Sequence, residues 1–147
     1  MQLKLFTPLG LTLALLIGNS LSWRSPVAVA ETVEIAQAAP SASQFVTVDR
    51  SHPTTGSFRI VTENGQQYLE FDQQFSTGGG PDVEVILYRS ATIPTAIAEA
   101  DYVKLDQLQR LRGSQRYSIP ADIDLDEYGS VGIWCRTFNI TFGYAAL

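Results

Sequence analysis

The sequence predicts an all-β domain, an antiparallel β-sandwich or a barrel-like, jelly-roll-like fold of about seven to nine short strands. Apolar side chains recur at every second position in short runs along the chain, which is typical of strands buried on one face. Gly, Pro and an Asn-Gly pair separate these runs and supply tight turns. Neither a βαβ pattern nor an internal repeat is present, and 147 residues leave room for one such domain.

The first strands follow from alternation. Residues 45–50 (FVTVDR) and 57–62 (SFRIVT) alternate between apolar and polar side chains, with the turn-forming SHPTTG between them. Asn64-Gly65 is the strongest short signal for a two-residue hairpin turn. It therefore predicts a hairpin that pairs the second strand with a third strand at 67–71.

The middle of the chain is less regular. Three glycines and a proline at 78–81 predict an irregular loop before a strand at 83–88. The segment 93–102 (IPTAIAEADY) is the only stretch that tolerates a helix, of at most two turns. Three leucines spaced by three predict either a helical turn or the apolar anchors of a loop, and a short strand follows at 114–120; the leucines are Leu105, Leu108 and Leu111.

The last segment, residues 131–147, contains the only cysteine of the chain within a dense run of strand-forming side chains. If one strand runs unbroken, Trp134 shares the buried face with Phe142, and Cys135 points to the opposite face. If a bulge lies at Arg136–Thr137, Cys135 joins Phe142 in the core, because a bulge shifts the alternation by one residue. The sequence leaves both arrangements open.

The N-terminus predicts an exported protein. A positive charge at Lys4, an apolar run of about ten residues and the Ala28-Val29-Ala30 cleavage motif are typical of a secretory signal peptide, and the run is too short to span a bilayer. We therefore expect a signal peptide at 1–30, a flexible leader at 31–43 and one β domain at 44–147. The expected location is the periplasm, the cell envelope or the extracellular space, with no membrane span after cleavage.

The net charge of the chain limits the classes of partner that it can bind. Without residues 1–30 the chain keeps eight Lys and Arg against fifteen Asp and Glu, a net charge of −7. Nucleic acid and anionic lipid both select clustered positive charge, so neither is expected as a partner. Four basic side chains form only a small local group, which we interpret as a solvated loop; they are Lys104, Arg110, Arg112 and Arg116.

One cysteine and one histidine restrict the chemistry. A lone cysteine in an oxidising compartment indicates a buried inert thiol, an intermolecular disulfide, or a reactive or liganded sulfur. Blue copper needs two histidines and covalent haem needs C-x-x-C-H, and no metal site is predicted. Non-covalent haem stays open, with Cys135 or His52 as axial ligand and Trp134 lining an apolar slot. No nucleophile elbow or acid–base pair is evident, so a stand-alone enzyme is not expected.

Several motifs together resemble the DM-thirteen domain, a proposed electron-transfer module found alone in bacteria and beside DOMON domains in animal Skeletor-type proteins. The resemblance covers about residues 44–147. The matching motifs are F-x6-H at 45–52, GPDVEVIL at 80–87, GSQ-x-Y-x-I-P at 113–120, DIDLDEYGSVGIWC at 122–135 and F-x-I-x-F-G-x-A-x-L at 138–147.

The resemblance implies a small extracytoplasmic β domain whose single cysteine does redox work, as a bare thiol or as a ligand to a group such as haem. Cys135 matches that cysteine, and His52 matches a histidine of the N-terminal motif. We expect a monomer that acts in electron transfer or thiol redox with a separate redox or envelope protein. Two alternatives stay open: a binding or adhesion module that uses the loops at 78–82 and 122–127 around a core cysteine, and a structural protein linked into dimers by an intermolecular disulfide.

Overall fold

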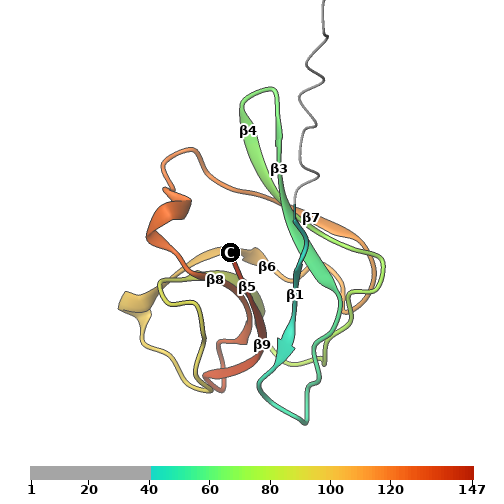
Figure 1. The fold of residues 1–147 in the computed structure, drawn as a ribbon. Helices are drawn as coiled ribbons and strands as arrows, with labels where there is room; N and C mark the ends of the chain where they lie inside the picture. The colour runs from blue at the N-terminus through green and yellow to red at the C-terminus, as the bar shows by residue number, and fades with distance from the viewer. Residues whose placement is uncertain (1–40) are drawn as a thin grey trace, which may run out of the picture. The chain divides into compact units, whose positions relative to one another are not determined.

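A computed structural model describes residues 41–147, and the predicted signal peptide and leader up to residue 40 lie outside the described residues (Figure 1). Two antiparallel sheets form a sandwich, which confirms the predicted fold class, and the described strands do not close into a barrel. Sheet A has the order β1 (Ser43–Gln44), β3 (Ser57–Glu63), β4 (Gln66–Phe71), β7 (Gln115–Ser118). Sheet B has the order β2 (Val46–Thr47), β9 (Ile140–Ala146), β8 (Ser130–Cys135), β5 (Val83–Tyr88), β6 (Tyr102–Gln107).

The predicted hairpin is confirmed. Asn64 and Gly65 join β3 to β4 with φ angles of 51° and 81°, and Glu63 pairs with Gln66 across the turn. Both central residues must adopt positive φ in such a turn, and Asn and Gly do so at the least cost.

The helix-tolerant segment forms only a 3₁₀ turn, η1 (Glu99–Asp101); a second such turn, η2 (Leu125–Glu127), precedes β8. Ile93 and Ile97 are buried, and they cover the outer face of sheet B instead of lying on a helix. The helical turn considered for the leucines is wrong, because Leu105 belongs to strand β6. No helix among the described residues is long and apolar enough to cross a membrane.

Apolar side chains gather in two places. The main core lies between the sheets, and a second cluster lies on the outer face of sheet B around Ile86 and Trp134. Asn139 links two parts of this second cluster by hydrogen bonds. Its Oδ1 accepts from Trp134 Nε1 at 3.1 Å and from Ile97 N at 2.9 Å. Its Nδ2 donates to Ile97 O at 3.1 Å. The 93–98 segment is thereby held against sheet B.

The register of β8 and β9 resolves the position of the cysteine. Ile133 pairs with Gly143 but the next residue, Trp134, pairs with Thr141, so Phe142 is an extra residue in β9. This bulge puts Phe142 on the core face together with Cys135, while Trp134 lies on the outer face. The arrangement with Cys135 in the core is therefore the one observed. The break in alternation lies at Phe142 and in the turn at 136–139, not in a bulge at Arg136–Thr137, and Phe138 is exposed.

Candidate functional site

The thiol of Cys135 lies at the end of β8, where the strand leaves the sheet. Its residue is 0% exposed, and Sγ donates a hydrogen bond to the carbonyl oxygen of Pro81 at 3.0 Å. Pro81 belongs to the loop Gly78–Asp82, which we call the glycine segment. The main chain of this segment therefore supplies the polar contact to the thiol.

Gly80 lies close to the thiol within the glycine segment. A Cβ atom at this position would lie 3.2 Å from Phe142 Cζ and 3.4 Å from Cys135 Sγ. The distance to Phe142 is tight and the distance to Sγ is an ordinary contact, so the absence of a side chain at residue 80 lets the segment lie close to the thiol and to the tip of the Phe142 ring.

His52 lies on the other side of Phe142. The two rings stack with centroids 4.1 Å apart and an interplanar angle of 6°. Asp49 holds the imidazole, because its Oδ2 lies 2.5 Å from His52 Nδ1. Gly78 packs against the same histidine: a Cβ there would lie 2.6 Å from His52 Cδ2. The glycine segment thus spans from His52 at one end to Cys135 at the other.

Backbone hydrogen bonds hold the glycine segment at its two ends, while packing against His52 and the bond from Cys135 to Pro81 hold it between them. Thr77 N donates to Leu111 O at 3.0 Å before the segment, and Arg136 N donates to Asp82 O at 3.0 Å at its end. Gln107 Nε2 adds a bond of 2.6 Å to Asp82 Oδ1. Among the backbone hydrogen bonds of residues 41–147, none involves the three consecutive glycines 78–80. Few bonds would have to break for this cover to move.

His52 lowers the pKa of Asp49 below 3.8, first through its hydrogen bond to the carboxylate, with the Ser51 N–H adding to the effect. A lowered pKa in the folded state stabilises the protein above the unfolded value of 3.8, and this contribution is lost as pH falls through the folded value. We therefore expect the difference in free energy of unfolding between wild type and Asp49→Asn to be full above about pH 4 and to shrink in more acidic solution.

Urea unfolding across a pH series measures this difference. The same comparison in a His52→Phe background should lose most of the pH dependence. A difference that stays constant down to strongly acidic pH would contradict the proposed link between Asp49 and His52.

Comparison with known families decides what kind of domain carries this site. The model of the family described as "Electron transfer DM13" matches residues 44–147, which is the whole β domain. This chain belongs to the DM13 family. Searches against curated proteins and against solved structures gave no match.

Electron transfer raises the question of a bound group, and the surroundings of Cys135 in this DM13 domain do not fit a haem. The thiol is fully buried and already bonded to Pro81, and neither Cys135 nor His52 lines the depression on sheet A or the smaller one beside Gly56. No group of three or more His, Cys, Asp or Glu within residues 41–147 is placed to hold a metal ion.

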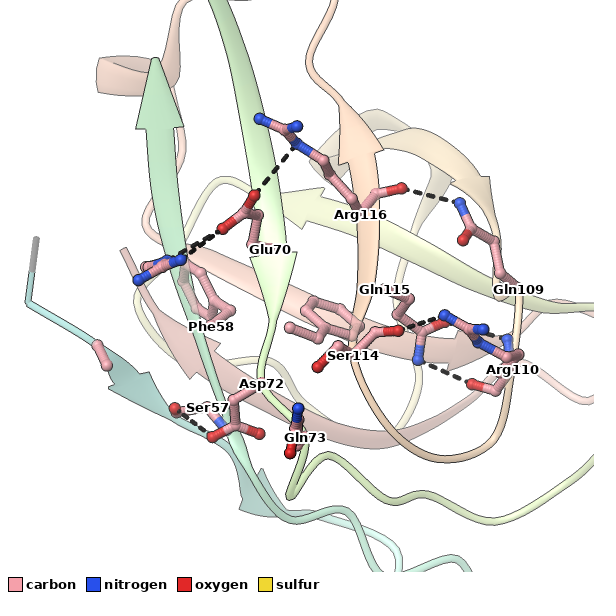
Figure 2. Close-up of a pocket in the computed structure, with 13 residues that line it drawn as sticks. Ser57, Phe58, Glu70, Asp72, Gln73, Gln109, Arg110, Ser114, Gln115 and Arg116 are labelled. Atoms are coloured by element: carbon pink, nitrogen blue, oxygen red, sulfur yellow. Dashed lines mark hydrogen bonds and ion pairs between the residues drawn. The ribbon is translucent and has the colours of Figure 1, made fainter. Parts of the chain in front are cut away.

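The larger depression, of about 720 Å³, lies on sheet A and the 109–116 loop (Figure 2). Two ion pairs lie across this depression. Arg59 Nη2 lies 2.9 Å from Glu70 Oε2, and Arg116 Nε lies 3.2 Å from Glu70 Oε1. The guanidinium groups of Arg59 and Arg116 each have a carboxylate partner, and the guanidinium of Arg110, which also lines this depression, donates to the backbone oxygen of Ser114.

The structure brings together two of the three residues that the sequence predicts as a cofactor-binding site. Cys135 and His52 both adjoin Phe142, whereas Trp134 lies on the opposite face of sheet B. Their role in binding a cofactor stays a prediction. Asp49 and the contact of the glycine segment with the thiol were missed. The i, i+3 spacing of Asp49 and His52 around a turn was the available signal for the first, and the three consecutive glycines for the second.

Proposed function

We propose that this chain is an exported electron-transfer domain that works through the thiol of Cys135, which reacts with a disulfide of a partner protein when the glycine segment moves aside. Membership of the DM13 family supports the electron-transfer part. The signal peptide motif supports export to a compartment where disulfides persist.

The observation that carries the proposal is the nature of the cover over Cys135. A core cysteine is usually enclosed by interlocking side chains, which resist displacement. Here the polar partner of Sγ is the loop carbonyl of Pro81, and the preceding residue, Gly80, adds no side chain to the cover. Moving this loop exposes the thiol without unpacking either sheet.

The Cys135 sulfur attacks one sulfur of the partner disulfide, so one S–S bond forms and one breaks. The departing partner sulfur takes up the proton that Cys135 loses. Cys135 is oxidised to a mixed disulfide, and the departing sulfur is reduced to a thiol. A low-molecular-weight thiol then attacks the Cys135 sulfur, which frees the partner as a dithiol and leaves a new mixed disulfide on Cys135. A second such thiol displaces Cys135 as a thiol and departs with the first as a disulfide, so two electrons pass from the two thiols to the partner disulfide.

The alternative is a binding module in which Cys135 is only a core residue. One observation favours it, namely the complete burial of the thiol. The two functions differ in how the sulfur becomes reachable: by local movement of the glycine segment, or only by unfolding of the whole domain.

We expect Gln107→Ala to raise the rate at which a neutral pyridyl disulfide labels Cys135 in the folded protein by about fivefold, because it removes one hydrogen bond that holds Asp82, worth about 1 kcal/mol. Ile119→Val is the matched control. Ile119 is buried in the core, and its backbone N–H donates to Gln67 O on β4, so truncation of its side chain should lower global stability by about 1 kcal/mol without touching the segment.

The control separates the two routes. If the glycine segment opens locally, Ile119→Val should label at the wild-type rate. If labelling requires global unfolding, Ile119→Val should speed it about fivefold and Gln107→Ala should act only through its effect on global stability. That second outcome would reject the proposed function in favour of the binding module.

A further inference from the structure

The cations of the domain divide into two equal groups. Residues 41–147 contain eight Lys and Arg side chains. Four of them form ion pairs with carboxylates: Arg59, Arg89, Lys104 and Arg116. Within the described part of the chain, the other four form no ion pair, and all are exposed: Arg50, Arg110, Arg112 and Arg136.

Three of the four unpaired arginines, Arg50, Arg112 and Arg136, lie on segments that frame the glycine segment, whereas Arg110 lines the depression on sheet A and donates to Ser114 O there. Arg136 directly follows Cys135, and its N–H bonds to Asp82 at the end of the segment. Arg112 forms an isolated bridge with Ser76, just before the segment begins. Arg50 lies in the turn between Asp49 and His52.

The carboxylates at this end are already engaged. Asp49 accepts from His52 and Ser51, and a single glutamine, Gln107, donates its side-chain amide to Asp82 and its backbone N–H to Asp106. These acidic groups therefore offset the arginines without pairing with them.

The opposite end of sheet B carries the acidic surplus. The antiparallel register puts Tyr88, Tyr102 and Ser130 at the end of the sheet farthest from Cys135. Six carboxylates lie on the loops and turns that lead into these strands, and Arg89 is the cation paired there; the six are Glu99, Asp101, Asp122, Asp124, Asp126 and Glu127. The net negative charge of the domain is thus concentrated away from the thiol.

Apolar side chains accompany the arginines. Leu111 is 45% exposed and lies beside Gly79, since a Cβ at that glycine would be 3.3 Å from Leu111 Cδ1. Phe138 is 63% exposed in the turn that follows Cys135. Exposed apolar groups bordered by arginines are typical of protein-binding surfaces.

From these observations we infer that the surface around the glycine segment docks an acidic protein, one whose disulfide is surrounded by carboxylates. This rests on the proposed exchange through Cys135 and names the kind of partner. Unpaired arginines near the thiol attract such a partner, and the acidic far end of the domain repels it. Both effects favour approach of the partner at the thiol. The docking surface comprises Arg50, Leu111, Arg112, Arg136 and Phe138.

Three peptides test the inference. Each carries one cysteine as a mixed disulfide with thiopyridine, flanked by glutamates, glutamines or lysines. Reaction with Cys135 releases pyridine-2-thione, which takes the proton, and its absorbance gives the rate. At an ionic strength of about 10 mM we expect the acidic peptide to react about tenfold faster than the basic one, and the ratio to approach one at about 1 M salt.

Two matched variants test which part of the surface causes the difference in rate between the acidic and basic peptides. Arg112→Glu and Arg89→Glu change the net charge equally, but Arg89 lies at the far end of sheet B. Arg112→Glu should lower the acidic-to-basic rate ratio severalfold, and Arg89→Glu should leave it unchanged. If all three peptides react at equal rates, or if both variants act alike, the docking inference fails while the exchange function stands. If no peptide reacts with the folded protein, the exchange function itself fails.

Discussion

Replacing Gly78 by alanine is expected to raise the labelling rate of Cys135 about 5- to 150-fold, since overpacking of this kind costs about 1–3 kcal/mol. A Cβ at residue 78 would lie within 3.0 Å of three atoms of His52, two of them Cβ and Cα. Those atoms cannot turn away as a side-chain tip would. The new methyl group must therefore push the glycine segment off His52, and the cover over the thiol moves with it.

Gly79→Ala is the matched control, one residue along the same loop. Its Cβ would meet only Leu111 Cδ1, at 3.3 Å, and Leu111 is exposed and able to shift. Neither glycine has a positive φ that would exclude alanine, so the two variants differ only in what the new methyl group contacts. Equal labelling rates for both would contradict the view that contact between Gly78 and His52 keeps the thiol covered.

Local signals were sufficient to predict most of the strands. Asn64-Gly65 fixed a hairpin because few residue pairs accept its two positive φ angles, and alternation placed β3, β4 and β5 within a residue or two. The segment 93–102 failed as a helix because Ile93 and Ile97 gain more by covering the outer face of sheet B than a two-turn helix would gain in water.

The site was harder to predict, because it depends on register and on contacts between distant segments. Alternation cannot reveal that Phe142 is an extra residue in β9, since the bulge depends on how β8 pairs with it. Nor can it show that a loop 54 residues earlier, at Pro81, supplies the carbonyl that accepts from Cys135. The residues were visible in the sequence, but their proximity was not.

The ion pairs of the basic residues are a second example of contacts that the sequence alone does not reveal. The interpretation of the basic residues between 104 and 116 as one solvated group is wrong for two of them. Lys104 pairs with Glu84, and Arg116 pairs with Glu63 and Glu70 across sheet A. These four cations are close together in the sequence, but the arrangement of the strands separates them in space.

Replacing Lys104 by methionine is expected to lower the free energy of unfolding by about 2–4 kcal/mol, because it leaves a buried carboxylate without its cation. Glu84 is 1% exposed on the outer face of sheet B, opposite Trp134, and Lys104 Nζ lies 2.9 Å from its Oε1. The remaining donor, Gln107 Nε2, is 3.5 Å away and is shared with Asp82. Methionine keeps the apolar stem of lysine, so the loss is mainly electrostatic.

The asymmetry between the two partners makes this prediction specific. Glu84→Leu removes the buried charge, and the freed Lys104 side chain, already 38% exposed, can turn to solvent. We therefore expect Glu84→Leu to cost about 1 kcal/mol or less, and the Glu84→Leu/Lys104→Met double variant to unfold close to wild type, because an apolar pair can replace a buried ion pair at little cost. Urea unfolding of the four proteins measures the cycle. A Lys104→Met cost no larger than that of Glu84→Leu would mean that water reaches Glu84, and that the pair contributes no more than an exposed ion pair does.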